Sequence, residues 1–79
     1  MLTLADLKPD ERAVIDTVDP ARPSVQRLML MGLVEGTEVE FVTASLGGDP
    51  LEIRVYGSTL SLRRDDALRF TVQRVQALA

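Results

Sequence analysis

The chain has 79 residues, a formal net charge of -3, and neither cysteine nor histidine. This length supports a single domain around one hydrophobic core, and the missing residue types exclude disulfides, thiolate or imidazole metal ligands, a cysteine nucleophile and a Ser-His-Asp triad within the chain. The acidic balance disfavours nucleic acid as a partner, because nonspecific binding to phosphates depends on basic residues.

The sequence contains no sign of export or membrane insertion. Its first residues lack a basic segment followed by an apolar run, so they do not form a signal peptide. No apolar stretch approaches the roughly 18 residues that suggest a transmembrane helix. We therefore expect one soluble, cytoplasmic domain over residues 1–79, and we expect it to be complete because it ends just after its last predicted strand.

The first predicted elements are one helical turn and a strand. Thr3, followed three residues later by Asp6, is typical of a capping arrangement for a single turn. A turn at Pro9–Glu11 follows. The β-branched segment Arg12–Val18 predicts a strand whose inward side chains are Ala13 and Ile15.

A short helix is predicted over Val25–Met31. Two prolines lie in the loop before it, and Ser24 suits the N-cap position, where a side-chain oxygen accepts a hydrogen bond from a helix amide. Gly32 suits the C-terminal stop, because glycine adopts a positive φ without steric cost. Gly36 has the same role in the turn that leads to the second strand.

The predicted helix has one apolar face and one apolar residue outside it. At about 100° per residue, Val25, Leu28 and Met31 share a face that is expected to pack on the sheet, with Met29 at its margin. Leu30 points nearly opposite to Leu28 and has no evident partner within the chain. A single exposed leucine is common on protein surfaces; the alternative is that Leu30 contacts another protein.

Alternation of apolar and polar residues predicts four more strands. Their ranges are Glu38–Thr43, Leu51–Tyr56, Thr59–Arg63 and Phe70–Val75. The side chains expected in the core are Val39, Phe41, Leu51, Ile53, Val55, Leu60, Leu62, Phe70 and Val72. The two middle strands are expected to form a hairpin around Gly57–Ser58. We expect a single 3₁₀ turn at Arg64–Leu68, with Ala67 and Leu68 covering the end of the barrel.

These elements favour a mainly β fold. Five short strands joined by tight turns, with one short helix between strands 1 and 2, suit a small closed or nearly closed barrel. Closure removes the exposed edges that an open five-stranded sheet would have to protect.

Short motifs distributed over nearly the whole chain carry a resemblance to a known family. The segments that carry it, in order, are Leu7–Ala13, Arg27–Leu28, Met31–Leu33, Gly36, Leu46–Leu51, Leu60–Arg63 and Asp66–Ala67. In this order and spacing they resemble the ferrous iron transport protein A (FeoA) family. The family often has proline where Ser45 stands and a single glycine before Asp-Pro, whereas this chain has Gly47 and Gly48.

The resemblance implies an SH3-like barrel without catalytic activity or cofactor. It implies a small cytoplasmic accessory of the membrane ferrous-iron transporter FeoB, which carries a GTP-binding domain, and a weak homo-oligomer is compatible with it. The C-terminal SH3-like module of DtxR-type metal-dependent repressors is similar in pattern, and a regulatory module of that kind is the alternative. An enzyme is disfavoured by the residues themselves, since Tyr56, Ser58, Ser61 and the carboxylates form no recognisable spacing of nucleophile and base.

The candidate site of this chain is therefore a protein-binding surface. We predict that the partner contacts Arg27, Leu30, Met31 and Leu33. Asp65 and Asp66 could join Asp49 or Glu52 around a hard cation, but adjacent carboxylates are more often a solvated turn, so we predict no metal site. Ferrous iron in particular favours imidazole or mixed ligands, which the chain cannot supply.

Four arginines cluster in the second half of the sequence. They are Arg54, Arg63, Arg64 and Arg69. Cross-strand pairing with Glu38, Glu40 and Glu52 is the favoured reading, at about 1 kcal/mol or less for each pair. The alternative is a basic strip that docks on an acidic partner or on membrane headgroups.

Overall fold

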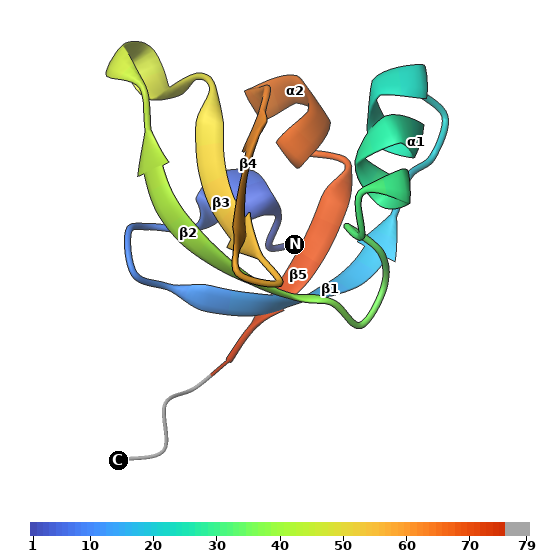
Figure 1. Ribbon diagram of the computed structural model, residues 1–79, viewed down its shortest axis with the longest axis horizontal. Coiled ribbons are helices and arrows are strands. Elements are labelled where there is room, and N and C mark those ends of the chain that lie inside the picture. The colour runs from blue at the N-terminus through green and yellow to red at the C-terminus, as the bar shows by residue number, and fades with distance from the viewer. Residues whose placement is uncertain (76–79) are drawn as a thin grey trace.

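The computed structural model describes residues 1–75, which form one strongly curved antiparallel sheet of five strands in the order β4-β3-β2-β1-β5 (Figure 1). The strands are β1 Arg12–Val18, β2 Glu38–Ala44, β3 Leu51–Val55, β4 Ser58–Leu62 and β5 Phe70–Arg74. The helical elements are the 3₁₀ turns η1 Leu4–Asp6 and η2 Leu46–Gly48 and the α-helices α1 Pro23–Leu30 and α2 Arg64–Ala67. Within this range, no helix has the length and apolarity that crossing a bilayer requires.

The core follows the alternation of the strands. Alternate residues of the strands point to the core, as the two-residue period requires, except where the register shifts after Ile15 in β1 and after Phe41 in β2. Eight of the nine predicted core side chains, together with Ala13 and Ile15, are at most 4% exposed: Val39, Phe41, Leu51, Ile53, Val55, Leu62, Phe70 and Val72. Leu60 is partly buried and packs against this core. The prediction of a mainly β fold with a helix between β1 and β2 is confirmed.

The N-terminal turn closes one side of the sheet. Thr3 and Asp6 form the predicted capping box, in which the Thr3 amide donates to Asp6 at 2.8 Å. The same segment lies along β5, because the Val72 amide donates to the Leu2 carbonyl at 2.9 Å and Thr3 bridges Thr71. The edge of β5 is thus paired, while β4 forms the other end of the sheet.

Two turns differ from the sequence prediction. The β3–β4 turn consists of Tyr56 and Gly57, one residue earlier than predicted, and Ser58 already belongs to β4. Both turn residues have positive φ, +51° and +79°, as a two-residue turn of the primed type requires. The segment after β4 is one turn of α-helix and not a 3₁₀ turn, because Ala67 N–H donates to the carbonyl four residues earlier. Its Ala67 is buried as predicted, whereas Leu68 is 53% exposed.

Glu11 joins the first turn to the last strand. The Lys8 amide donates to its Oε1 at 2.7 Å, and Arg74 Nε lies 2.8 Å from its Oε2. The Lys8 hydrogen bond, with a further contribution from Arg74, lowers the pKa of Glu11 below its ordinary value of 4.5, although desolvation acts in the opposite direction.

This contact predicts a pH effect on stability. The pKa of Glu11 is lower in the folded chain, so its contribution is present above pH 4.5 and is lost as the pH falls through the folded-state pKa. We expect Glu11→Gln to flatten the decline of the free energy of unfolding below pH 4.5, measured by urea denaturation across that range. Glu35→Gln removes an exposed carboxylate that accepts no hydrogen bond within residues 1–75, and it controls for net charge. Parallel profiles of the wild type and Glu11→Gln would contradict the prediction.

Candidate functional site

The C-terminal end of α1 determines which side chains of this region reach the surface. Gly32 has a φ of +105°, and its amide donates to the Met29 carbonyl at 3.0 Å. The Leu33 amide returns to the Leu28 carbonyl at 3.1 Å. These two bonds form a Schellman motif, in which the residue after the glycine folds back onto the last helical turn. Leu33 is therefore completely buried in the core, beside the helix that it follows.

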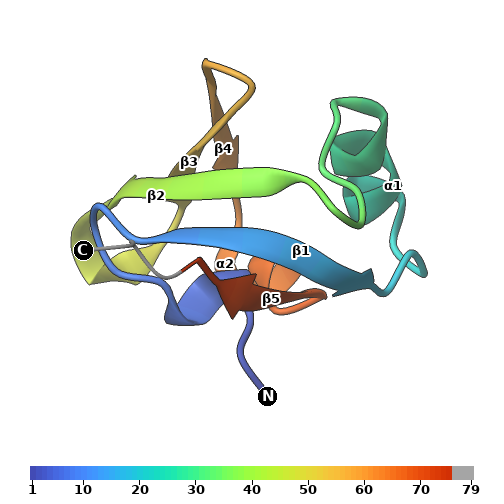
Figure 2. The same cartoon turned by 90° about the horizontal axis from the view of Figure 1, so that it is seen from below.

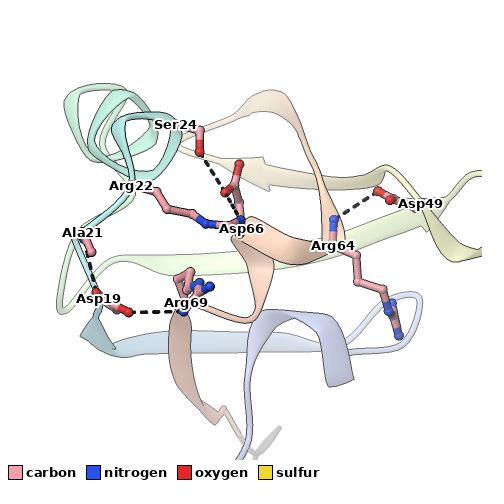
Figure 3. A network of polar contacts seen from close by, with 8 residues as sticks. All are labelled: Asp19, Ala21, Arg22, Ser24, Asp49, Arg64, Asp66 and Arg69. Atoms are coloured by element: carbon pink, nitrogen blue, oxygen red, sulfur yellow. Dashed lines mark hydrogen bonds and ion pairs between the residues drawn. The ribbon is translucent and has the colours of Figure 1, made fainter.

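The predicted N-cap of α1 is wrong. The helix begins at Pro23 with Arg22 as N-cap, and no side chain caps it. Ser24 lies inside the first turn, and its hydroxyl donates to Asp66 Oδ1 at 2.8 Å (Figure 3). The Arg22 guanidinium lies 3.4 Å from the same oxygen. The buried Asp66 carboxylate thereby ties the beginning of α1 to α2.

Two of the four predicted contact residues have different positions from those expected. Val25 and Leu28 face the core as predicted, but Met31, which was assigned to the same face, is 54% exposed because it is the C-cap and its chain has left the helical path. The prediction that Leu33 contacts a partner is wrong, because its side chain has no exposed area. Leu30 is 89% exposed, and Arg27 is exposed on the same side of the helix, one turn earlier.

Two further apolar side chains adjoin this end of α1. Tyr56 is exposed, and its ring lies against Gly32, where an added Cβ would stand 3.2 Å from Cε2. Val34, two residues after Gly32, is also exposed. We refer to Arg27, Leu30, Met31, Val34 and Tyr56 together as the α1 surface. Neither Val34 nor Tyr56 was predicted as a contact. Tyr56 follows the inward Val55, so the two-residue period places it outward, but nothing in the sequence placed it beside Gly32.

Tyr56 also lines a cleft of about 330 Å³, together with residues of β1, β2 and β3. Its charged walls are two ion pairs, Arg54–Glu40 at 2.8 Å and Arg12–Glu38 at 3.9 Å. Both pairs are partly exposed, so each contributes little to stability. Since the four charges balance within the cleft, it offers no net electrostatic attraction to an ion.

The acidic cluster proposed around Asp66 does not assemble in the structure. Asp66 accepts hydrogen bonds from Ser24 and Arg22, and Asp49 accepts one from the Arg64 amide at 3.0 Å (Figure 3). Among residues 1–75, no three acidic side chains are grouped as metal ligands would be. These carboxylates stabilise α2 and its contacts.

The arginines do not form the predicted cross-strand set. Arg54 pairs with Glu40 across β3 and β2 as predicted, but Arg69 pairs with Asp19 at 3.4 Å. The guanidinium of Arg64 donates to the backbone carbonyls of Ala5 and Gly48. Arg63 is exposed, and no carboxylate within the described part of the chain lies within ion-pair distance of it.

Comparison with known proteins identifies the fold and the family together. Residues 2–74 match the model of the FeoA domain. The chain belongs to the FeoA family. This family is linked to ferrous iron transport, and its domain is a non-enzymatic accessory domain. No curated protein matches the sequence.

Solved structures of FeoA proteins have the same fold. FeoA from Chlorobium tepidum is 36% identical, with 95% of this chain and 71% of that chain covered and a TM-score of 0.86. FeoA from Stenotrophomonas maltophilia, solved with zinc, is 31% identical over 92% of this chain and 91% of that one, with a TM-score of 0.81. That protein is described as a prokaryotic SH3 domain protein and a candidate activating factor of ferrous iron transport. The present fold is therefore SH3-like, as predicted.

The same fold recurs inside a longer chain. T. acidophilum IdeR aligns with a TM-score of 0.79, covering 91% of this chain and 33% of that one. At 22% identity, this likeness establishes the fold alone.

Proposed function

We propose that this FeoA-family chain is a cytoplasmic accessory protein that binds the cytoplasmic part of the ferrous-iron transporter FeoB and thereby supports or regulates iron uptake. Family membership carries this proposal, because it links the chain to ferrous iron transport. Localisation at the inner face of the membrane would follow from the partner. The alternative of a DtxR-like regulatory module has only the shared fold in its favour.

The α1 surface is the contact that we assign to this function. Leu30 is the most exposed of its apolar side chains, and Met31, Val34 and Tyr56 are exposed as well, with the Tyr56 ring against Gly32 at the end of α1. Exposed apolar side chains that adjoin one another are characteristic of protein interaction sites. Arg27 provides a charged rim, and arginine and tyrosine are frequent among the residues that dominate binding energy. Of the predicted contacts, Arg27, Leu30 and Met31 remain in the proposal.

A titration of the cytoplasmic part of FeoB with this protein tests the proposal. We expect Leu30→Asp to weaken binding by about 30-fold or more, because it places a charge in the centre of an apolar contact. Leu46→Asp is the matched control: Leu46 is also fully exposed, but it lies in η2 at the far end of the sheet from α1 (Figure 1). Equal affinities for the wild type and Leu30→Asp would remove the α1 surface, and no binding by the wild type would overturn the proposed function.

A further inference from the structure

Tyr56 occupies a turn position that disfavours its residue type. The two-residue turn between β3 and β4 requires a positive φ at both of its residues, and Gly57 adopts one without steric cost. Tyr56 adopts the other, at +51°, where asparagine, aspartate or glycine is the usual residue. A bulky residue with a positive φ is an outlier, because its Cβ crowds the backbone. Within residues 1–75, the only other non-glycine residue with a positive φ is Asp10, whose type tolerates it.

Burial does not explain the choice of tyrosine at this position. An aromatic residue usually stabilises a fold through the large area that its ring buries. Tyr56 is 78% exposed, and its contact with Gly32 involves one edge of the ring, at Cε2 and Cδ2. Residues held in sparsely populated backbone conformations are concentrated at functional sites. An unfavourable φ combined with an exposed ring therefore indicates a role outside folding.

Two surface features share this ring. Figure 2 shows the β3–β4 turn projecting from the sheet next to α1, in agreement with the contact between Tyr56 and Gly32. Tyr56 also lines the cleft of about 330 Å³. The other apolar side chain of the cleft lining belongs to Val39, which is buried in the core. Tyr56 is thus the exposed apolar side chain that the cleft and the α1 surface have in common.

The charged residues of the cleft favour a protein as its occupant. In the sheet register, Glu40 lies opposite Arg12 on one side and opposite Arg54 on the other, and it pairs with Arg54 at 2.8 Å. Glu38 pairs with Arg12. Because these charges neutralise one another, the cleft suits neither a polyanion nor a polycation. An aromatic side chain beside partly exposed polar groups is instead the composition of a protein–protein interface.

We propose that Tyr56 is a binding determinant for the partner protein, and that the contact continues from the α1 surface across its ring into the cleft. The partner packs an apolar or aromatic side chain against the ring and places polar groups over the ion pairs. Tyrosine is frequent among the residues that dominate the binding energy of protein interfaces. The inference rests on the proposed function, and it specifies which side chain the cytoplasmic part of FeoB engages beside α1.

Tyr56→Asn separates binding from folding. Asparagine is a favoured residue at this position of the turn, so we expect the urea midpoint of unfolding to stay the same or to rise. In a titration with the cytoplasmic part of FeoB, we expect binding to weaken by about 30-fold, the loss typical of a hot-spot residue. Tyr56→Phe keeps the ring and is the matched control, and we expect it to bind within about threefold of the wild type.

The titration and the unfolding midpoint each have an outcome that contradicts the inference. Wild-type affinity in Tyr56→Asn, or an equal loss of affinity in Tyr56→Phe, would exclude the ring as a determinant while leaving the proposed function in place. A lower unfolding midpoint in Tyr56→Asn would also overturn the inference, because the tyrosine would then serve the fold. Absence of binding by the wild type would overturn both the inference and the proposed function.

The extent of the contact is measured by NMR on the wild-type chain. When the cytoplasmic part of FeoB is added, the amide resonances of Val39 and Gly57, which line the cleft, are expected to shift together with that of Leu30 on α1. The amide resonance of Leu46, in η2, is expected to stay in place. A shift at Leu30 without shifts at Val39 and Gly57 would contradict the continuation of the contact into the cleft.

Discussion

Leu33→Ala is expected to lower the free energy of unfolding by about 2–5 kcal/mol, the usual cost of truncating a buried leucine. Leu33 has no exposed area, and the Schellman motif at Gly32 holds it against the core. A domain of this size has a total stability of about 4–12 kcal/mol, so this one substitution removes a large part of it. Urea denaturation at neutral pH measures the effect directly.

Leu30→Ala is the matched control for this prediction. The same side chain is removed three residues earlier, from a position that is 89% exposed. We expect a change of about 0.5 kcal/mol or less in the free energy of unfolding. The two substitutions thus distinguish folding from binding. Replacing Leu33 should lower the free energy of unfolding, whereas replacing Leu30 should lower only the affinity for FeoB. Comparable losses of stability in both variants would show that the helix is placed differently.

Asp66→Ala is expected to reduce the free energy of unfolding by about 1.5–3 kcal/mol, since a hydrogen bond to a charged group contributes in this range. The Asp66 side chain is 11% exposed, and its carboxylate accepts a hydrogen bond from Ser24 at 2.8 Å. Its removal leaves the half-buried Ser24 hydroxyl without that partner and detaches the beginning of α1 from α2. Because α1 carries the proposed contact surface, we also expect weaker binding of FeoB by this variant.

A double-mutant cycle isolates this contact. Ser24→Ala and Asp66→Ala together should cost less than the sum of the single changes, with a coupling of about 0.5–3 kcal/mol. Asp66→Asn retains an acceptor for Ser24 and loses the charge that faces Arg22, so its effect should be smaller. The Arg22 contribution is modest, because its side chain is 42% exposed. Strict additivity of the two alanine substitutions would show that the Ser24–Asp66 bond does not hold α1.

Most of the fold was predictable because strands impose a period of two on burial. The alternation in β2 and β3 placed Val39, Phe41 and Ile53 in the core without any knowledge of their neighbours. The predictions that failed lie where the chain leaves a regular element. The helical period assigned Met31 to the core, and Leu33, beyond the predicted helix, was expected to contact a partner. A positive φ at Gly32 reverses the direction of the chain there, so that Met31 is exposed and Leu33 is buried.

The candidate site was predictable in part for the same reason. Exposure of Leu30 follows from helical periodicity alone, and it is confirmed. The position of Tyr56 beside Gly32 joins residues 24 positions apart in the sequence, and the bond from Ser24 to Asp66 joins residues 42 apart. Ser24 illustrates the limit of local reasoning, since a good N-cap residue proved to be bound to a distant carboxylate.

The sequence by itself determined the five strands, most of the inward side chains, the helix before the second strand and the FeoA family. These features depend on local periodicity, turn chemistry and the order of short motifs. Tertiary structure decided where α1 ends, which leucine is buried, and which strands form the two ends of the sheet. Those properties depend on contacts between segments far apart in the chain, and no local pattern encodes them.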